Sequence, residues 1–464
     1  MHSDTRTPHT SVRHYRLPLL LALALVAAAL ASLVGAGPAP AAARSTGTDD
    51  PAIQALARAA RPLDSTEPGA PARDLLPLDR MIGSAKIVGV GEATHNSREF
   101  FRMKHRLFQH LVEEKGFTMF ALEANWSAGL RLNDYVLHGK GNPKQIMREE
   151  FQESYLIWNV REYLDLVTWM RSYNIEHPDP ADQVQFMGDD MAYAGPALFD
   201  SVLEYVGAHH PRLKPEFERL YRASRPTTGV RDWIKAYMVR PLPERRRMAA
   251  DVQRAFELLE RQGPGADREQ YAWVLQHARV IAQVGKEFGY DFFDEKQLAE
   301  AMLHRDRSMA ANTLWWQRQT GHRMLLSAHN GHVGFETSNP KQYPKLQGQF
   351  LREQAGTDYR SIGFTFGQGS FNALDLNDPE EHIREFSVGA PAPGSNEHTL
   401  EQVRRGDYYL DLRRVSPAAR TWLSGFRPTW SIGNAWPDQP QPVRLGTSYD
   451  VLVHLHRITA ADRL

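Results

Sequence analysis

Short apolar runs alternate with helical patterns along the first half of the chain, and each run ends at polar residues. The first example is residues 86–112, KIVGVGEATHNSREFFRMKHRLFQHLV, whose apolar, β-prone start stops at Gly-Glu. Apolar residues then recur at helical spacing over residues 100–112, and Asn96 with Glu99 three residues later predicts a capping box. The pattern therefore predicts a strand, a helix and a short turn between them that carries two polar groups, Glu92 and His95.

Three further apolar runs have the same form. They are FTMFALEANW, which ends at Glu123; VQFMGDDM, which ends at Asp190; and HRMLLSAHNGHVGF, which ends at His329 and His332. Strands that alternate with helices predict an α/β fold with a largely parallel sheet flanked by helices. The carboxyl ends of parallel strands meet at one edge, where such folds bind ligands. We therefore expect these polar groups to gather in one site.

The pattern changes between the third and fourth of these strands. Residues 214–319 are helical almost throughout, which predicts an inserted helical bundle that roofs the cleft. Further strands are predicted at YRSIGFTF, DYYLDLR and SYDVLVHLHRI. The predicted organisation is a signal peptide at 1–43, a linker at 44–77, a first α/β part at 78–213, the bundle at 214–319, and a second α/β part with a smaller C-terminal α/β portion at 320–464.

The N-terminus has the order of regions that a secretory signal needs: basic residues, the apolar run LLLALALVAAALA, and small residues that place cleavage after Ala43. This predicts a secreted or extracytoplasmic protein. The alternative is an uncleaved membrane anchor, because the apolar run approaches membrane-spanning length. The chain has no cysteine, which excludes disulfides, thiolate metal ligands and a cysteine nucleophile.

Charge and missing motifs narrow the function. The 55 basic and 55 acidic side chains cancel, which argues against nucleic acid or an acidic membrane as a partner. The sequence contains no G-x-S-x-G elbow, no P-loop and no H-E-x-x-H motif, so a serine nucleophile of the α/β-hydrolase type is disfavoured and no cofactor is predicted. Nothing in the sequence indicates the oligomeric state.

The polar strand ends suit hydrolysis by water. A lone strand-end carboxylate is usually a helix cap, but two glutamates and two histidine sites on separate strands are hard to explain as independent caps. A histidine at a helix N-terminus is kept neutral and can take a proton from water. A neighbouring glutamate can fix its tautomer, and further donors can face the developing oxyanion.

Several of these segments together resemble the erythromycin esterase family. The resemblance covers the chain from about Leu78 onward and rests on GEATHNSREFFRMKHRLFQHLVEEKGF, FALEANW, WNVREYLDLVTWMRSYN, FMGDDM, RDRSMAANTLWW, SAHNGHV and YDVLVHL, in that order. It implies an α/β core with an inserted helical bundle. It also implies hydrolysis of a small-molecule ester or macrolactone by an activated water, and hence macrolide resistance as the associated function.

The resemblance assigns roles residue by residue. His95 matches the family's catalytic histidine, Glu123 its essential glutamate and Glu92 its first acidic residue, while the late histidine is His329 or, as second choice, His332. Expected substrate or oxyanion contacts are Lys104, His332, Asp190 and the cleft-wall residue Trp126. The best-known resistance enzymes carry arginine where this chain has Lys104, and lysine lacks the planar fork of arginine. Because the leader predicts export, the substrate is either a drug met before it enters the cell or a different extracellular ester.

Two other functions fit the same residues. Three histidines and two glutamates could hold zinc, manganese or iron in a metal-dependent hydrolase. An exported iron- or haem-binding protein on a related scaffold is the alternative from another class. Arg305 and Asp306 are expected to form an ion pair on the helical bundle, with Arg305 facing the site as the alternative.

Overall fold

We describe residues 50–379, 382–404 and 406–464 of the chain from a computed structural model. The predicted signal peptide, residues 1–43, lies outside the described residues. Within the described ranges, no helix combines the length and the apolar character that crossing a membrane requires.

The described residues form a mixed α/β fold around a ten-stranded sheet, as predicted. The strand order is β1-β8-β12-β6-β2-β5-β3-β4, with β7 and β10 also paired to β6. The six strands β12, β6, β2, β5, β3 and β4 pair parallel with one another, while β8 pairs antiparallel with β12 and β1, and β7 pairs antiparallel with β6. Each apolar run predicted to be a strand is one. The bounds are β1 Arg61–Pro62, β2 Ile87–Val90, β3 Phe117–Asn125, β4 Gln185–Asp190, β5 Arg323–Ser327, β6 Tyr359–Asp375, β7 Ile383–Val388, β8 Tyr408–Asp411, β10 Ala435–Trp436 and β12 Val451–Ile458, with β9 Arg427–Thr429 and β11 Gln441–Val443 in a separate two-stranded sheet.

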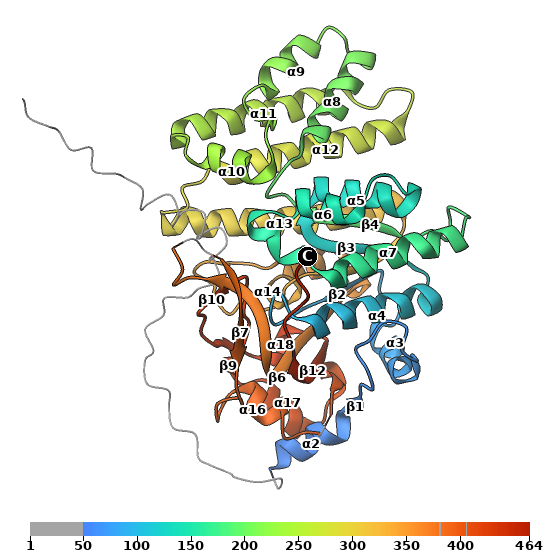
Figure 1. Ribbon diagram of the computed structural model, residues 1–464, viewed down its shortest axis with the longest axis vertical. Helices are drawn as coiled ribbons and strands as arrows, with labels where there is room; N and C mark the ends of the chain where they lie inside the picture. Colours follow the sequence, from blue (N-terminus) through green and yellow to red (C-terminus); the bar gives the residue numbers. More distant parts are fainter. Residues whose placement is uncertain (1–49, 380–381, 405) are drawn as a thin grey trace, which may run out of the picture.

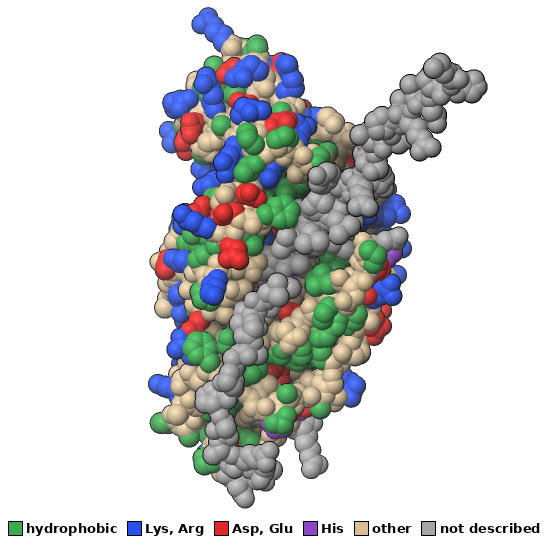
Figure 2. All heavy atoms as spheres, turned by 90° about the vertical axis from the view of Figure 1, so that its left-hand side faces the viewer, with side chains coloured by type: hydrophobic (Ala, Val, Ile, Leu, Met, Phe, Trp, Pro, Cys, Tyr) green, Lys and Arg blue, Asp and Glu red, His purple; other side chains and the backbone are tan. Residues whose placement is uncertain are grey.

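Helices surround the sheet and also form one end of the molecule. Figure 1 shows α8–α12 stacked at that end, with α13 between them and the sheet, and the C-terminal strands and short helices at the opposite end. On the face drawn in Figure 2, positive and negative side chains are mixed over the α8–α12 end. The bounds are α2 Pro51–Ala59, α3 Leu76–Ile82, α4 Arg98–Lys115, α5 Trp126–His138, α6 Pro143–Glu150, α7 Arg161–Glu176, α8 Pro196–His209, α9 Lys214–Tyr221, α10 Val230–Met238, α11 Leu242–Gln262, α12 Arg268–Phe288, α13 Glu295–Thr320, α14 Asn330–Val333, α15 Gln347–Ala355, α16 Asn396–Leu400, α17 Pro417–Leu423 and α18 Leu445–Ser448.

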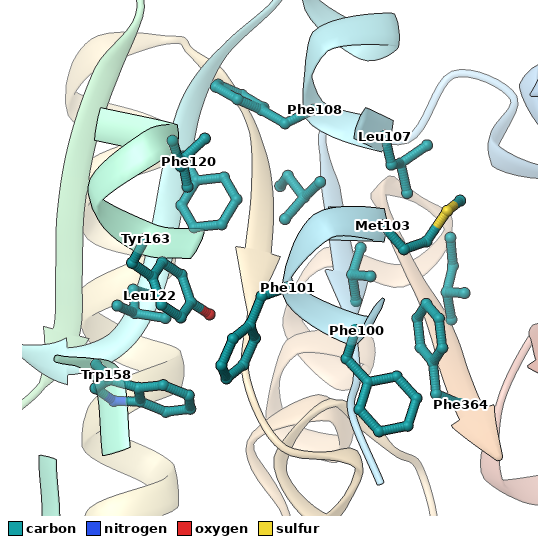
Figure 3. Close-up of a cluster of buried hydrophobic side chains, with 14 of the residues drawn as sticks. Phe100, Phe101, Met103, Leu107, Phe108, Phe120, Leu122, Trp158, Tyr163 and Phe364 are labelled. Carbon is teal, nitrogen blue, oxygen red and sulfur yellow. The ribbon is translucent and has the colours of Figure 1, made fainter. Parts of the chain in front are cut away.

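The apolar face of α4 fixes the turn that precedes it. Phe100 packs edge-on against Phe364 of β6 with 5.4 Å between ring centroids, and Phe101 lies 4.8 Å from Tyr163 of α7, as Figure 3 shows. Burying a phenylalanine side chain contributes roughly 2–3 kcal/mol through its apolar area. Because both neighbouring positions are buried, the start of α4 cannot rotate or slide, and the residues after β2 are held at the sheet edge.

The predicted capping box at the start of α4 is wrong. The helix begins at Arg98, with Ser97 at the N-cap and no side-chain capping bond. The Asn96 amide instead donates to the Ile157 carbonyl at 2.6 Å, and the Glu99 carboxylate accepts from the backbone and hydroxyl of Thr459. Partners that are distant in sequence therefore replace the local bonds that the pattern indicates.

Part of the stretch predicted as a linker is folded. Helix α2 lies within residues 44–77, and its Leu56 is fully buried in a cluster with residues of β8 and α17. Strand β1 then pairs with β8. Helices also begin at Pro196, before the predicted start of the bundle at residue 214. The boundaries of a separate bundle domain stay a prediction.

Candidate active site

The turn after β2 carries a histidine whose orientation is set by two buried partners. Gly91 leaves the strand against α14, where a Cβ would lie 2.2 Å from the Asn330 side-chain oxygen. In the turn, His95 Nδ1 lies 2.8 Å from Glu92 Oε1, and both side chains are buried. Lys104 of α4 contacts the other Glu92 oxygen and donates to Ser327 Oγ at 3.0 Å. Glu92 therefore accepts a hydrogen bond from Nδ1–H, which keeps the ring proton on Nδ1 and leaves a lone pair on Nε2.

His95 Nε2 forms no hydrogen bond with the described residues and is not closed off by the protein. The rings of Trp158 and His329 flank it, with centroids at 5.2 and 4.7 Å. Burial lowers the pKa of Lys104, although Glu92 acts in the opposite direction. A basic nitrogen that is free, oriented and next to a second imidazole is the arrangement that a general base needs.

His329 presents a donor beside this base. It ends the β5 segment and is the N-cap of α14, where its Nδ1 accepts from the Gly331 N–H at 3.1 Å. The ring proton of a neutral imidazole must then be on Nε2, which is buried and has no partner among the described residues. Burial holds the pKa of His329 well below its usual value, and a positive charge on the neighbouring His95, when that ring is protonated, acts in the same direction. His329 is thus a neutral donor.

Glu123 holds this donor in place. Its Oε2 accepts from the His329 backbone N–H at 2.9 Å, and its Oε1 lies 2.9 Å from Arg305 Nη2 and 3.2 Å from His332 Nε2. Burial would raise the pKa of Glu123, but His332, His95 and Arg305 outweigh burial and hold that pKa well below its usual range. A carboxylate with such a low pKa and three donors around it is a poor base, so we assign it a positioning role.

A second layer of ion pairs surrounds Glu123. His332 Nδ1 lies 2.8 Å from Asp306 Oδ1, and Arg305 Nε donates to Asp190 Oδ2 at 3.0 Å. Burial alone would lower the pKa of His332, but Glu123 and Asp306 raise it to about 10. The His332 imidazole is therefore charged at neutral pH and is unavailable as a base.

The structure brings together seven of the eight residues predicted for the site. Glu92, His95, Lys104, Glu123, Asp190, His329 and His332 lie in one contact network at the carboxyl ends of β2–β5. Trp126 lies outside this network. Its ring packs in the core, with its centroid 5.9 Å from that of Trp315 and 5.2 Å from that of Trp316. The turn into α5 points this side chain toward the bundle rather than the sheet edge.

Sequence reasoning missed Asp306 and Tyr155, and it placed Arg305 at the site only as an alternative. Arg305 and Asp306 do not form an ion pair on the bundle, because Arg305 binds Glu123 and Asp190 while Asp306 binds His332. The Tyr155 hydroxyl also donates to Asp190. One signal was available for Asp306: it shares an i, i+4 stripe with the buried apolar Met302 and Ala310, so a charge there needs a buried partner.

A pocket adjoins the late histidines. It encloses about 640 Å³ of empty space, including part that is open to solvent, and it is lined by His329 and His332. Its other walls come from residues 336–339, Tyr343 and the C-terminal residues Ser431, Gln441 and Val443. A small molecule can therefore reach the edge of the network from the side of the C-terminal loops.

The network does not fit a metal well. Lys104 occupies one Glu92 oxygen, and Arg305 and His332 together occupy Glu123 Oε1. These cations take the positions at which carboxylates would ligate a metal ion. Among the described residues, the group of histidine and carboxylate ligand atoms that converges within 4.8 Å is Glu401, His454 and His456, which shares no residue with this network.

Known proteins resemble this chain over most of its length. Erythromycin esterase type II of Escherichia coli is 24% identical over 368 residues, which are 74% of this chain and 84% of that protein. A putative hydrolase, YbfO, of Bacillus subtilis strain 168 is 20% identical over 423 residues, covering 87% of this chain and 90% of that protein.

Solved structures show the same fold. A Bacillus cereus protein has a TM-score of 0.80 at 30% identity and covers 89% of this chain and 98% of its own. A succinoglycan biosynthesis protein has a TM-score of 0.78 at 29% identity, and the match covers 90% of this chain and 100% of that protein's chain. A mutant of erythromycin esterase EreC in its open conformation has a TM-score of 0.65 at 16% identity, and the match covers 85% of this chain and 95% of the EreC chain. The erythromycin esterase family model matches residues 112–458, and the chain belongs to that family.

Proposed function

We propose that this protein hydrolyses a carboxylic ester or lactone with a water molecule activated by His95. The observation that carries the proposal is the pair of oppositely prepared imidazoles: a lone pair on His95 Nε2, fixed by Glu92, beside a proton on His329 Nε2, fixed by Gly331. One ring can accept a proton while the other donates a hydrogen bond. Membership of the family supports a hydrolase, and the low identities leave the reaction itself to be tested.

The steps follow from these two tautomers. His95 Nε2 takes a proton from water as the water oxygen attacks the ester carbonyl carbon, and Glu92 stabilises the imidazolium that forms. The carbonyl oxygen becomes negative and can accept from the His329 Nε2–H, which was left unpaired in the resting protein. The tetrahedral intermediate then breaks its bond to the alcohol oxygen. His95 returns its proton to that oxygen, so an ester gives one acid and one alcohol, while a lactone gives a single hydroxy acid.

The substrate class is tested by offering candidates. Two of the relatives are erythromycin esterases, which supports a macrolactone as one candidate. A panel of macrolactones and simple esters, followed by mass spectrometry for a gain of one water, should identify the substrate. Single-turnover hydrolysis in oxygen-18 water should then place the label directly in the product acid. A trapped acyl-serine adduct, or no turnover of any ester or lactone, would contradict the proposal.

Variants test the assigned residues. His95→Ala and Glu123→Gln should each abolish turnover, the first by removing the base and the second by releasing the His329 backbone. Because both act in one unit, the double variant should lose little more than either single one. His209→Ala is the matched control, since that histidine is exposed at the end of α8. Near-full activity in either folded single variant would refute the roles assigned here.

We also propose that the protein is exported, on the order of basic, apolar and small residues in its first 43 positions. Protein recovered from the culture medium should begin at Arg44. Intact chain that starts at Met1 and stays inside the cell would contradict export.

A further inference from the structure

Three side chains away from the candidate active site converge at one point beside β12. His454 and His456 are two residues apart on this strand, so both project from the same face of the sheet. Glu401, at the end of α16, lies between them: its Oε1 is 2.9 Å from His454 Nε2 and its Oε2 is 2.9 Å from His456 Nδ1. All ligand atoms of this Glu401 cluster lie within 4.8 Å of one another.

The surroundings hold the cluster in shape. Thr365 Oγ1 lies 2.9 Å from His454 Nδ1, so the far nitrogen of that ring is already bonded while Nε2 faces the glutamate. Metal-binding histidines hydrogen-bond through their outer nitrogen, and the Thr365 hydroxyl can accept from His454 Nδ1–H once Nε2 binds an ion, because a hydroxyl both donates and accepts. His456, two residues further along the same strand, is anchored through its backbone N–H to Asp407 Oδ1 at 2.8 Å. The histidines therefore need no rearrangement of the strand to act as ligands.

Room for the carboxylate is provided by a glycine. A Cβ at Gly367 of β6 would lie 2.0 Å from Glu401 Oε1 and 2.7 Å from the His456 carbonyl oxygen. Any larger residue there would displace the glutamate from between the two rings. Access is also present: His454 is fully buried, while the Glu401 and His456 side chains are 25% and 23% exposed. An ion could thus enter from solvent past Glu401 and His456 and reach His454 at the inner end of the cluster.

We propose that Glu401, His454 and His456 form a binding site for a divalent transition metal of the zinc class. Two imidazoles and one carboxylate are ligands that zinc accepts, and water would complete a tetrahedron. Ligand atoms around tetrahedral zinc lie roughly 3.3–3.5 Å apart, given bonds of about 2.0–2.1 Å. The two 2.9 Å contacts seen here are hydrogen bonds, so binding exchanges their protons for the ion and moves the atoms apart by about half an ångström. The ion would join β12 to the end of α16.

Zinc titration of the whole chain tests this site. After chelator treatment and dialysis, calorimetry should show one Zn²⁺ bound per chain at micromolar affinity or tighter, and the melting temperature should rise with Zn²⁺. Cobalt in place of zinc should give the visible absorption of a four-coordinate site. Glu401→Gln and His456→Gln should each weaken binding about tenfold or more, the range found when metal-site partners are changed.

Two controls separate this site from other histidines. His398→Gln alters a histidine three residues before Glu401 on the same helix, and His95→Gln alters the candidate active site; both should bind zinc as the parent does. No stoichiometric binding by the parent would mean that the cluster is only a hydrogen-bonded group, and unchanged binding by Glu401→Gln or loss in His95→Gln would place the metal elsewhere. His456→Gln, at the partly exposed end of the cluster, keeps the test decisive if Glu401→Gln does not fold.

Discussion

Replacing Glu92 by glutamine should remove the base without removing the histidine. In the protein, Glu92 accepts from two donors at once: His95 Nδ1 at 2.8 Å and Lys104 Nζ at its other oxygen. Glutamine has a single oxygen, and the Lys104 ammonium competes for it because a charged donor makes the stronger hydrogen bond. The amide NH₂ then faces His95 Nδ1, which can only accept from it. The ring proton moves to Nε2, where the lone pair for catalysis should be.

The size of the loss follows from the role. General-base catalysis contributes about 10²–10⁴-fold to a rate, which corresponds to roughly 3–5 kcal/mol of transition-state stabilisation. We therefore expect Glu92→Gln to lower kcat/KM on the best ester of the panel by this factor. Substrate affinity should change little, since Glu92 lies behind His95 and is fully buried. Stopped assays, read by mass spectrometry over the pH range in which both proteins stay folded, would measure the change in kcat/KM.

A second substitution tests the tautomer argument itself. In Glu92→Gln/Lys104→Met the competing ammonium is gone, so the amide can turn its oxygen toward His95 Nδ1 and restore the lone pair on Nε2. The double variant should regain about tenfold or more over Glu92→Gln, an effect of about 1.4 kcal/mol. Glu397→Gln, a buried glutamate of α16, serves as the control for loss of a buried carboxylate. If Glu92→Gln stays within about threefold of the parent, or if the double variant shows no recovery, the reasoning is refuted.

Two further predictions concern stability. Burial opposes the charge on His332, but Glu123 and Asp306 raise its pKa from 6.5 to about 10. The charged ring should stabilise the fold fully below pH 6.5, and this stabilisation should be lost as the pH rises through 10. The pKa difference of 10 − 6.5 = 3.5 corresponds to a free energy of unfolding of about 5 kcal/mol as an upper limit. Urea unfolding of the parent and His332→Gln at both pH values measures this loss. Gly129→Ala should destabilise the fold by about 1–3 kcal/mol or more, because its Cβ would lie 1.9 Å from the Gly188 backbone nitrogen.

Each of these two has a clear contrary result. A stability difference between the parent and His332→Gln that is equal at both pH values would mean that the ring is not charged in the fold. For Gly129, an alanine variant that melts with the parent would show that α5 moves away from β4 at no cost. Gly389→Ala is the matched control, since a Cβ there meets nothing within 4 Å.

Much of the fold and of the site was determined by the sequence alone. Apolar runs that end at polar residues identify β2–β5 because a buried strand must be apolar and its exit must meet water or a site. Parallel order then brings Glu92, Glu123 and His329 to one edge, since all four strands end there. The spacing of apolar residues over 100–112 likewise predicts α4, the helix that follows β2.

Only the tertiary structure decided how these groups act. The two tautomers depend on a lysine on the next helix and on the backbone of α14, and the partners of Glu123 come from α13 and from the start of α14, at least 182 residues away in sequence. Asn96 and Glu99 leave the predicted cap for the same reason: buried polar groups bind whichever partner the packing brings, and these partners are remote. Trp126 differs because a single residue at a strand end can turn toward either layer, and only packing against Trp315 and Trp316 selects the core. Local pattern determines which segments are buried, whereas contacts between distant segments determine which proton sits on which nitrogen.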